Sequence, residues 1–386
     1  MLILLIPVQL GKHFWPDFAF INGIRIDYLA PTVYLTDILI GLMLLSWLIT
    51  SYKRGKDQIL DIRGWIFWLL LVGIFVEANI YFSLSPYVAI FRWIKYLEMG
   101  LLVVYISKAH ISIRRITKLL ILAGLFTAFL ALMQLVNDGS IGGLFYFLGE
   151  RSFNLNTPGI ARQMLFGREY LRPYATFAHP NILAGYFVIT MPFILSGQWI
   201  GKNLKLFLAG LWLMIIYISG STMALIVSIG ILFQYIKIRS LYKYLAFGAI
   251  VFIMGILSIT YGLESVSRRV ELNNIAYELY RSSPIIGIGM NNFIVQMSNY
   301  PNINEPGFFF QPAHNIYLLL LAEGGIIGLT LLTWLIWKVY MIGLKRKSYI
   351  IPLVAILVLG LFDHYPLTLQ QGQLLLALVI GLNLRK

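Results

Sequence analysis

The chain has 386 residues, of which 59% are hydrophobic and only 12% are charged, against roughly 25% charged in a typical soluble domain. The absence of cysteine excludes disulfides, thiolate catalysis and zinc–thiolate sites. The net charge of +14 would suit a nucleic-acid partner, but the basic residues form short clusters between apolar runs. That arrangement is typical of membrane topology, so we predict an integral membrane protein with no nucleic-acid partner.

Apolar runs recur from end to end, and a perpendicular span needs ~20 residues. They predict membrane segments near residues 34–51, 64–83, 87–107, 116–137, 179–200, 204–219, 221–236, 244–262, 314–338, 349–363 and 368–384. Residues 1–10 are apolar but short, and are predicted to form a truncated or half-buried first helix. The fold class is therefore an all-α polytopic membrane protein with about 11–12 transmembrane helices.

Lysine and arginine set the orientation of these segments, because cytoplasmic connections carry an excess of both. One side holds 19 of the 30 basic residues. They are Lys53, Arg54, Lys56, Arg63, Lys108, Arg114, Arg115, Lys118, Lys202, Lys205, Lys237, Arg239, Lys243, Lys338, Lys345, Arg346, Lys347, Arg385 and Lys386. That side, with the C-terminus, is predicted to be cytoplasmic.

Two long loops lie on the opposite side, at residues 138–178 and 263–313. Both are longer than plain connections, so we predict that they fold and function. The whole chain, 1–386, is thus predicted to be a single integral membrane domain. The two loops would form a partly helical cap on its outer face.

Both outer loops carry arginine and no lysine. The arginines are Arg151, Arg162, Arg168, Arg172, Arg268, Arg269 and Arg281. A guanidinium group grips phosphate or carboxylate at two points, which an ammonium group cannot do. Any one of these arginines is as well explained by surface charge balanced by nearby glutamates, but the set predicts an anionic ligand.

The first informative stretch runs from Arg172 through Pro-Tyr-Ala-Thr-Phe-Ala to His179-Pro180-Asn181. Arg172 precedes a proline, which disfavours helix at its own position. Pro180 suits the first turn of a helix, and a helix start offers free N–H groups to an anion. We therefore predict that Arg172 binds an anion here with His179 and Asn181 in the pocket. An alternative role for His179 is capping or packing.

The second stretch opens a helix at His314, with Asn315 and Tyr317 in its first turn. An imidazole accepts a proton near neutral pH, so a histidine at a membrane boundary is a candidate general base. The alternative is a solvated interfacial histidine. Glu323 lies nine residues on, about 13 Å deeper and half a turn round an ideal helix. Glu323 is therefore predicted not to pair with His314. It would have a structural or tuning role, and its carboxyl group would either have a partner on another helix or be protonated.

The connection between the last two segments reads Asp363-His364-Tyr365-Pro366 and faces outward in the same topology. This pattern predicts a second acid and histidine lining the same outer cavity.

Two patterns concern contacts between helices. Arg92, Lys95 and Glu98 recur at i, i+3 and i+6, and a charged stripe in a membrane helix must face protein or water. A buried ion-pair network is the favoured interpretation. Gly324 and Gly328 form a small-xxx-small pair that allows a neighbouring helix to approach closely.

In these residues the chain resembles the O-antigen ligase/O-antigen polymerase superfamily of bacterial envelope proteins. The stretches that carry the resemblance are RPYATFAHPNILAGY from Arg172, RSSPIIGIGMNNF from Arg281, and HNIYLLLLAEGGIIG from His314. With the helix count and the large loop before the His-Asn helix, the resemblance covers roughly residues 60–384. One departure is visible, because family members often have a Ser-Arg pair in the turn that here reads Ser219-Gly-Ser-Thr-Met223.

The resemblance implies a GT-C-like fold and a metal-independent, inverting glycosyl transfer that uses no cofactor. Such enzymes move a glycan from an undecaprenyl-pyrophosphate carrier to a glycan, lipid or protein acceptor. The reaction takes place at the outer, periplasmic or extracellular, face of the bacterial cytoplasmic membrane. It serves the synthesis of lipopolysaccharide and other envelope polysaccharides. Neither outer loop has an Asp-x-Asp metal motif, which agrees with the expectation of no metal.

The resulting hypothesis gives His314 the role of activating the acceptor hydroxyl, while Arg172, with Arg281 or Arg162, holds the donor pyrophosphate. The pocket and supporting residues are His179, Asn181, Asn315, Tyr317, Glu323, Asp363 and His364. Ligase and polymerase activities remain open, since they differ only in the acceptor. A transporter or flippase of lipid-linked glycans is the alternative from another class, although ionisable residues gathered at one face argue against a path through the bilayer.

Overall fold

The structure, a computed structural model, describes residues 1–53, 66–165, 167–235, 248, 263–300, 310–344 and 349–385. Helices dominate it and the strands form only short pairs, which confirms the all-α fold class. Its contacts divide the chain into two compact units, which are described separately. Unit 1 comprises residues 1–10, 109–268 and 340–385, and unit 2 comprises 11–108 and 269–339.

Among the described helices, α1 (Leu35–Lys53), α4 (Ile113–Asn137) and α11 (Ile316–Leu344) are long and apolar enough to cross a membrane. The other predicted segments also coincide with helices, except 244–262, which apart from residue 248 lies outside the described residues. Residues 1–10 contain only the short 3-10 helix η1 (Leu2–Leu5). The twelfth transmembrane helix considered for that segment is therefore absent there.

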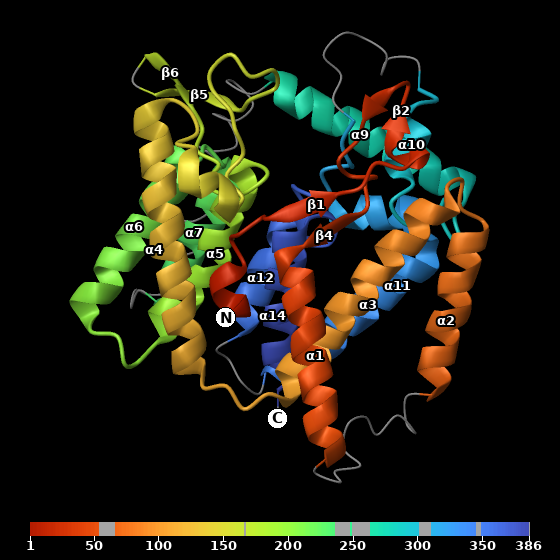
Figure 1. The fold of residues 1–386 in the computed structure, drawn as a ribbon, viewed down its shortest axis with the longest axis horizontal. Coiled ribbons are helices and arrows are strands. Elements are labelled where there is room, and N and C mark those ends of the chain that lie inside the picture. The colour runs from red at the N-terminus through yellow and green to blue at the C-terminus, as the bar shows by residue number, and fades with distance from the viewer. Residues whose placement is uncertain are drawn as a thin grey trace. The chain divides into compact units, whose positions relative to one another are not determined.

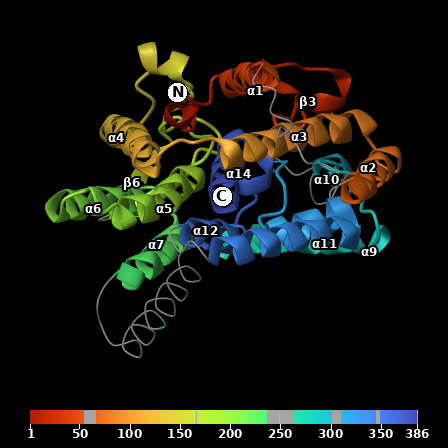
Figure 2. The ribbon, with the colours of Figure 1, turned by 90° about the horizontal axis from the view of Figure 1, so that it is seen from below.

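Unit 1 is built around α5 (Pro180–Ser196), whose residues are buried on every face from Pro180 to Ile194 except Asn181. A helix that is apolar all round belongs inside a bundle. Its neighbours lie beside it in both ribbon views (Figures 1 and 2). They are α4, α6 (Lys202–Ile218), α7 (Thr222–Tyr235), α12 (Ile350–Leu359) and α14 (Gln370–Leu384). The short helix α13 (Tyr365–Thr368) precedes α14.

The loop at 138–178 folds onto unit 1 as a mixture of helix and strand. It contains the 3-10 helix η3 (Gly143–Leu148) and an antiparallel hairpin of β5 (Arg162–Leu165) and β6 (Arg168–Leu171). The prediction of a folded, partly helical loop is confirmed. The hairpin was not predicted, because four-residue strands are too short to establish an alternating pattern.

Unit 2 contains α1, α2 (Ile66–Tyr81), α3 (Pro86–Lys108), α9 (Leu263–Ser282), α10 (Phe293–Met297) and α11. Residues 11–34 add a small layer of paired strands. These are β1 (Gly11–His13) with β4 (Thr32–Tyr34), and β2 (Phe20–Ile21) with β3 (Ile24–Arg25). Buried Leu29 of this layer belongs to the same apolar cluster as Leu272, Phe293 and Leu319, so the N-terminal segment covers α9, α10 and α11.

The charged stripe of α3 forms a buried ion-pair network, as predicted. The Lys95 ammonium lies 2.7 Å from Asp37 Oδ1 of α1 and 2.7 Å from Glu98 Oε2. Arg92 joins a different element, since its Nη2 donates to Asn291 Oδ1 at 2.7 Å. The stripe therefore ties α3 to α1 and to the segment between α9 and α11.

Helix α11 is broken at Gly325, where φ is +62° and ψ is −166°. The segment 284–289 lies against the break and satisfies the backbone groups that the break releases. The bonds are Ile288 N–H to Ala322 O (2.9 Å), Gly289 N–H to Glu323 O (3.1 Å), Ile326 N–H to Pro284 O (2.9 Å) and Ile327 N–H to Ile285 O (3.3 Å). Broken helices at membrane depth require such partners, because no water replaces the lost bonds.

The membrane segment predicted for residues 314–338 is present as α11, but the break at Gly325 within it was not predicted. The signal was the doublet Gly324-Gly325, because glycine adopts a positive φ without steric cost. Side chains of α2 and of the 284–292 segment lie near the predicted small-residue pair: a Cβ on Gly324 would lie 2.8 Å from Met290 Cε. A Cβ on Gly328 would lie 3.5 Å from the ring of Phe75 on α2.

Asn79 of α2 holds the broken region and is fully buried. Its Nδ2 donates to Ile286 O at 2.9 Å and Glu323 O at 2.8 Å. Its Oδ1 accepts from Met290 N–H and from Trp93 Nε1–H, both at 3.0 Å.

Replacing Asn79 with alanine is expected to lower the free energy of unfolding by about 2–4 kcal/mol, since buried groups lose their partners. Urea titration of the purified protein in detergent would measure the loss. Asn299→Ala, at an exposed amide, is the control and is expected to change stability by less than about 0.5 kcal/mol. Equal effects of the two substitutions would contradict the role assigned to Asn79.

Candidate functional site

Arg172 lies directly after β6 and joins three separated parts of unit 1. Its Nε donates to the carbonyl oxygen of Ser219, in the α6–α7 turn, at 2.6 Å. Its Nη2 donates to Asn181 Oδ1 at 2.7 Å, and Asn181 Nδ2 donates to Asp363 Oδ2 at 3.1 Å. The predicted residues Arg172, Asn181 and Asp363 therefore form one hydrogen-bonded chain at the start of α5.

His179 is the N-cap of α5, and Pro180 takes the first helical position. The His179 Nδ1 accepts the backbone N–H of Asn181 at 3.1 Å, so the ring satisfies one free donor of the helix start. The ring also packs edge-on against Tyr174, with centroids 6.1 Å apart. Burial raises the pKa of the Tyr174 phenol, which keeps it neutral beside these groups. Of the two roles considered for His179, capping is the one these contacts support.

Asp363 and His364 are buried, with 8% and 3% of their surfaces exposed. The backbone N–H of His364 donates to Asp363 Oδ1 at 2.8 Å, while the His364 Nδ1 lies 2.6 Å from Thr368 Oγ1. The next residue, Tyr365, lies against Gly185 of α5 so closely that a Cβ there would collide with the phenol. The Asp363 carboxylate thus bonds Asn181, and the His364 ring is held by Thr368 of α13.

Gln134 of α4 fixes the backbone of the stretch that carries Arg172 and His179. Its amide oxygen, Oε1, accepts the N–H groups of Tyr174 at 3.0 Å and of Ala175 at 2.6 Å. Its Nε2 donates to Ala175 O at 3.0 Å and to Glu150 Oε1 at 2.7 Å. Ala175 has a φ of +50°, an unfavourable conformation for a residue with a Cβ. Gln134 therefore holds a strained turn in place.

Replacing Gln134 with leucine is expected to cost about 3 kcal/mol of unfolding free energy, because the buried N–H groups of Tyr174 and Ala175 lose their acceptor and Glu150 loses one donor. Glycan transfer should also fall, since the turn between Arg172 and His179 loses its support. Thermal unfolding in detergent, measured with transfer, checks both effects. Asn137→Ala, at an exposed amide one turn on, serves as the control and should leave both unchanged. A Gln134→Leu protein as stable as the control would contradict this role.

His314 lies immediately before α11 in unit 2 and is half-buried. Its Nε2 lies 3.0 Å from Gln311 Oε1. An amide oxygen only accepts, so Nε2 is the donor in this contact. Asn315 caps the helix by accepting the N–H groups of Tyr317 (2.9 Å) and Leu318 (3.0 Å). The predicted helix start is confirmed, and it sets the imidazole at the mouth of the helix.

Glu323 is buried, with 6% of its surface exposed, and its Oε1 accepts the backbone N–H of Phe293 at 3.2 Å. Phe293 is the first residue of α10, so Glu323 has the partner on another helix that the sequence analysis gave as one of two alternatives. These contacts suit a structural role beside the break in α11.

The two further arginines proposed for the donor lie on the surface. Arg281 is exposed in the last turn of α9. Arg162 is also exposed, and its Nη1 lies 3.3 Å from Glu169 Oε2 across the hairpin. Its Nη2 also bonds the carbonyl oxygen of Leu155. The contacts of Arg162 are therefore local to the cap.

The predicted site residues belong to both units. Unit 1 holds Arg172, His179, Asn181, Asp363 and His364, while unit 2 holds His314, Asn315, Tyr317, Glu323 and Arg281. Sequence reasoning missed the supporting amides Gln134 and Asn79. Their signal was present, since a polar amide in an apolar helix is costly unless it is bonded.

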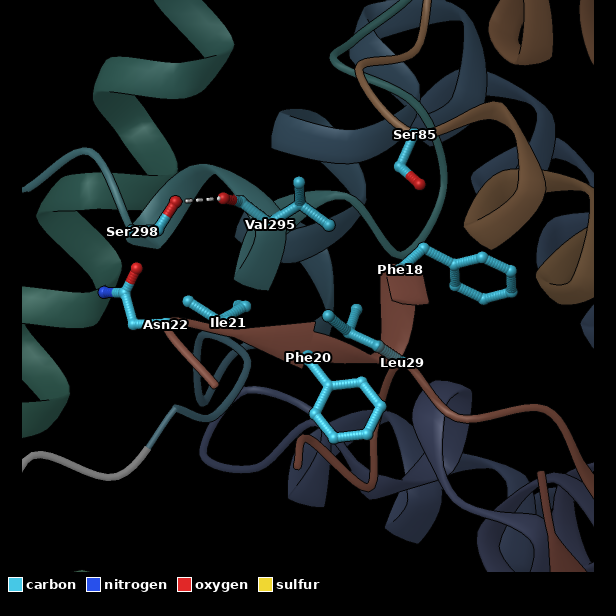
Figure 3. Close-up of a pocket in the computed structure, with 8 residues that line it drawn as sticks. All are labelled: Phe18, Phe20, Ile21, Asn22, Leu29, Ser85, Val295 and Ser298. Carbon is cyan, nitrogen blue, oxygen red and sulfur yellow. Dashed lines mark hydrogen bonds between the residues drawn. The ribbon is translucent and has the colours of Figure 1, made fainter. Parts of the chain in front are cut away.

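A separate pocket of about 290 Å³ lies in unit 2, between the N-terminal layer and α10 (Figure 3). Its lining is Phe18, Phe20, Ile21, Asn22, Leu29, Ser85, Val295 and Ser298. The Ser298 hydroxyl donates to Val295 O at 2.9 Å. These eight residues include no ionisable side chain, so the pocket offers apolar contact and hydrogen bonds but no charge for a pyrophosphate.

Residues 204–333 match a family model described as O-antigen ligase. The matched region runs from α6 to the second half of α11, and it includes His314 and the break at Gly325. Arg172 and the start of α5 precede it. A comparison with curated proteins gives no match.

Proposed function

We propose that this chain is a member of the O-antigen ligase/polymerase superfamily that carries out glycosyl transfer in a membrane, and the match of residues 204–333 to the O-antigen ligase family model supports this. The donor is a glycan linked to undecaprenyl pyrophosphate, and the acceptor is a hydroxyl of another glycan, a lipid or a protein. The transfer inverts the anomeric carbon and uses the chain's own residues without a metal. It takes place at the outer face of the bacterial cytoplasmic membrane, where the loops 138–178 and 263–313 form the cap of a single membrane domain.

The observation that carries this proposal is the placement of Arg172. Its guanidinium lies at the start of the buried helix α5, where free N–H groups and the helix dipole already favour an anion. Asn181 and the carbonyl oxygen of Ser219 hold two of its nitrogens, so the group is oriented before any ligand binds. A fixed cation at a helix start suits a pyrophosphate, whose negative charge grows as it leaves.

His314 supplies the proton acceptor in this reaction. The acceptor hydroxyl loses its proton to the His314 imidazole, while its oxygen forms a bond to the anomeric carbon of the donor. The bond between that carbon and the phosphate oxygen breaks, and its electron pair leaves with undecaprenyl pyrophosphate. The hydrogen bond of Nε2 to Gln311 then stabilises the imidazolium that forms. A single displacement of this kind inverts the anomeric centre.

The proposal is tested with purified protein, a synthetic undecaprenyl-pyrophosphate oligosaccharide and a panel of acceptors. Glycan transfer in the presence of a chelator is the expected result, with inverted stereochemistry of the new linkage. Transport of the labelled donor into acceptor-free liposomes, without any transfer, would overturn it in favour of a transporter. A deletion strain separates the two enzyme activities: loss of a polymerase leaves single repeats, whereas loss of a ligase leaves unattached polymer.

A further inference from the structure

A cluster of cations surrounds Trp199 in unit 1, at the opposite end of α5 from Arg172. Trp199 lies in the connection between α5 and α6. The Arg114 guanidinium carbon lies 5.4 Å from the Trp199 ring centroid and the Lys118 nitrogen lies 5.5 Å from it, so two cations from adjacent turns of α4 contact one indole. We call the surrounding group the Trp199 cluster. It comprises Arg114 and Lys118 at the ring, the other basic residues at the starts of α4 and α6 (Arg115, Lys202 and Lys205), and Arg385, which bonds the chain just before α4.

Several contacts hold the members of the Trp199 cluster together. Lys205 Nζ donates to the carbonyl oxygen of Leu195, in the last turn of α5, at 3.1 Å. Arg385 donates to the carbonyl oxygen of Ile111, just before the N-cap of α4. Arg114 and Lys118 of α4 contact Trp199, which lies three residues before α6, so the starts of the two helices lie close together, and neither has an acidic residue in its first turn.

The carboxylates of unit 1 lie away from this cluster. Those whose side chains the structure describes are Asp138, Glu150, Glu169 and Asp363. Asp138 caps the far end of α4, about 36 Å from Arg114 by helix rise, and Glu150 bonds Gln134 near that end. Asp363 bonds Asn181 in the first turn of α5, whereas Trp199 follows its last. Among the described residues, the six cations of the cluster form no ion pair.

We infer that the Trp199 cluster binds the phosphate headgroup of an anionic phospholipid. Tryptophan is enriched at the membrane–water boundary, at the level of the headgroups. Basic pockets between transmembrane helices at that level recognise anionic lipids. The indole restrains Arg114 and Lys118 before the lipid arrives, and the arginine fork grips a phosphate at two points. The starts of α4 and α6 add backbone N–H donors and the positive ends of two helix dipoles, which also favour an anion.

The test is native mass spectrometry of the delipidated full-length protein in detergent, titrated with palmitoyl-oleoyl phosphatidylglycerol. The wild-type protein is expected to retain this lipid and to bind the zwitterionic phosphatidylcholine of the same chains much more weakly. R114Q/K118Q is expected to lower the affinity for phosphatidylglycerol about 30-fold, the loss for two cations that face an anionic headgroup. R114K, which keeps the charge but loses the fork, should give a smaller loss.

The matched control is R25Q/K338Q, which also removes two cations that contact tryptophan rings, over Trp15 and Trp334. It is expected to change the affinity less than about 3-fold. Equal losses in both double variants would overturn the proposal, as would equal retention of phosphatidylcholine. Displacement of the lipid by inorganic phosphate at the same concentration would also overturn the proposal, because the ligand of the site would then be a free anion. Matching unfolding temperatures of the lipid-free variants ensure that the comparison concerns folded protein.

Discussion

Replacing His314 with alanine is expected to reduce glycan transfer by about 10²–10⁴-fold, the range that a positioned general base contributes. The acceptor hydroxyl then has no group to take its proton as the new bond forms. Donor binding should persist, because the proposed pyrophosphate contacts belong to Arg172 and the start of α5. Transfer from a purified lipid-linked donor measures the rate, and retention of undecaprenyl pyrophosphate by the same protein measures binding.

The control for this substitution is His110→Ala, since His110 is exposed and precedes α4. Its transfer rate is expected to stay within about twofold of the wild-type rate. Full activity of the His314→Ala protein with donor binding intact would rule out the base assignment. Loss of both activity and donor binding, with a lowered unfolding temperature, would instead identify His314 as a structural residue.

Replacing Arg172 with alanine is expected to lower transfer by about 10²–10³-fold, the typical cost of losing one fixed donor to a developing negative charge. Its guanidinium is oriented by Ser219 and Asn181, so no other side chain replaces that geometry. Affinity for undecaprenyl pyrophosphate should fall together with the rate. Arg172→Lys keeps the charge without the two-point fork and should recover only part of the loss. Steady-state transfer and direct binding of the carrier check both variants.

Arg151→Ala is the control for Arg172, because Arg151 is an exposed arginine of the same loop with one bond, at 3.2 Å, to the Ala178 carbonyl. It should leave transfer and carrier binding nearly unchanged. If Arg172→Ala behaves like this control, the anion site lies elsewhere in the outer loops. Arg162 and Arg281, both exposed, are then the next residues to replace.

The helices were predictable because a bilayer imposes length and apolarity, and both are visible in single segments such as 116–137 and 204–219. The helix starts at Pro180 and Ile316 were predictable too, since proline and asparagine have defined positions in a first turn. The N-terminal strand pairs and the β5–β6 hairpin were not, because strands of two to four residues hold too few positions for a period.

Residue chemistry by itself determined the membrane class, the candidate residues Arg172 and His314, and the expectation that Glu323 is structural, because each depends on local composition or helix geometry. Only the tertiary structure decided which groups, distant in the chain, orient and support these candidate residues. Ser219 and Asn181 orient Arg172, Gln134 holds the strained turn at Ala175, and the segment 284–289 satisfies the break in α11. Hydrogen bonds between residues far apart in the chain leave no spacing in the sequence, so only the folded chain shows them.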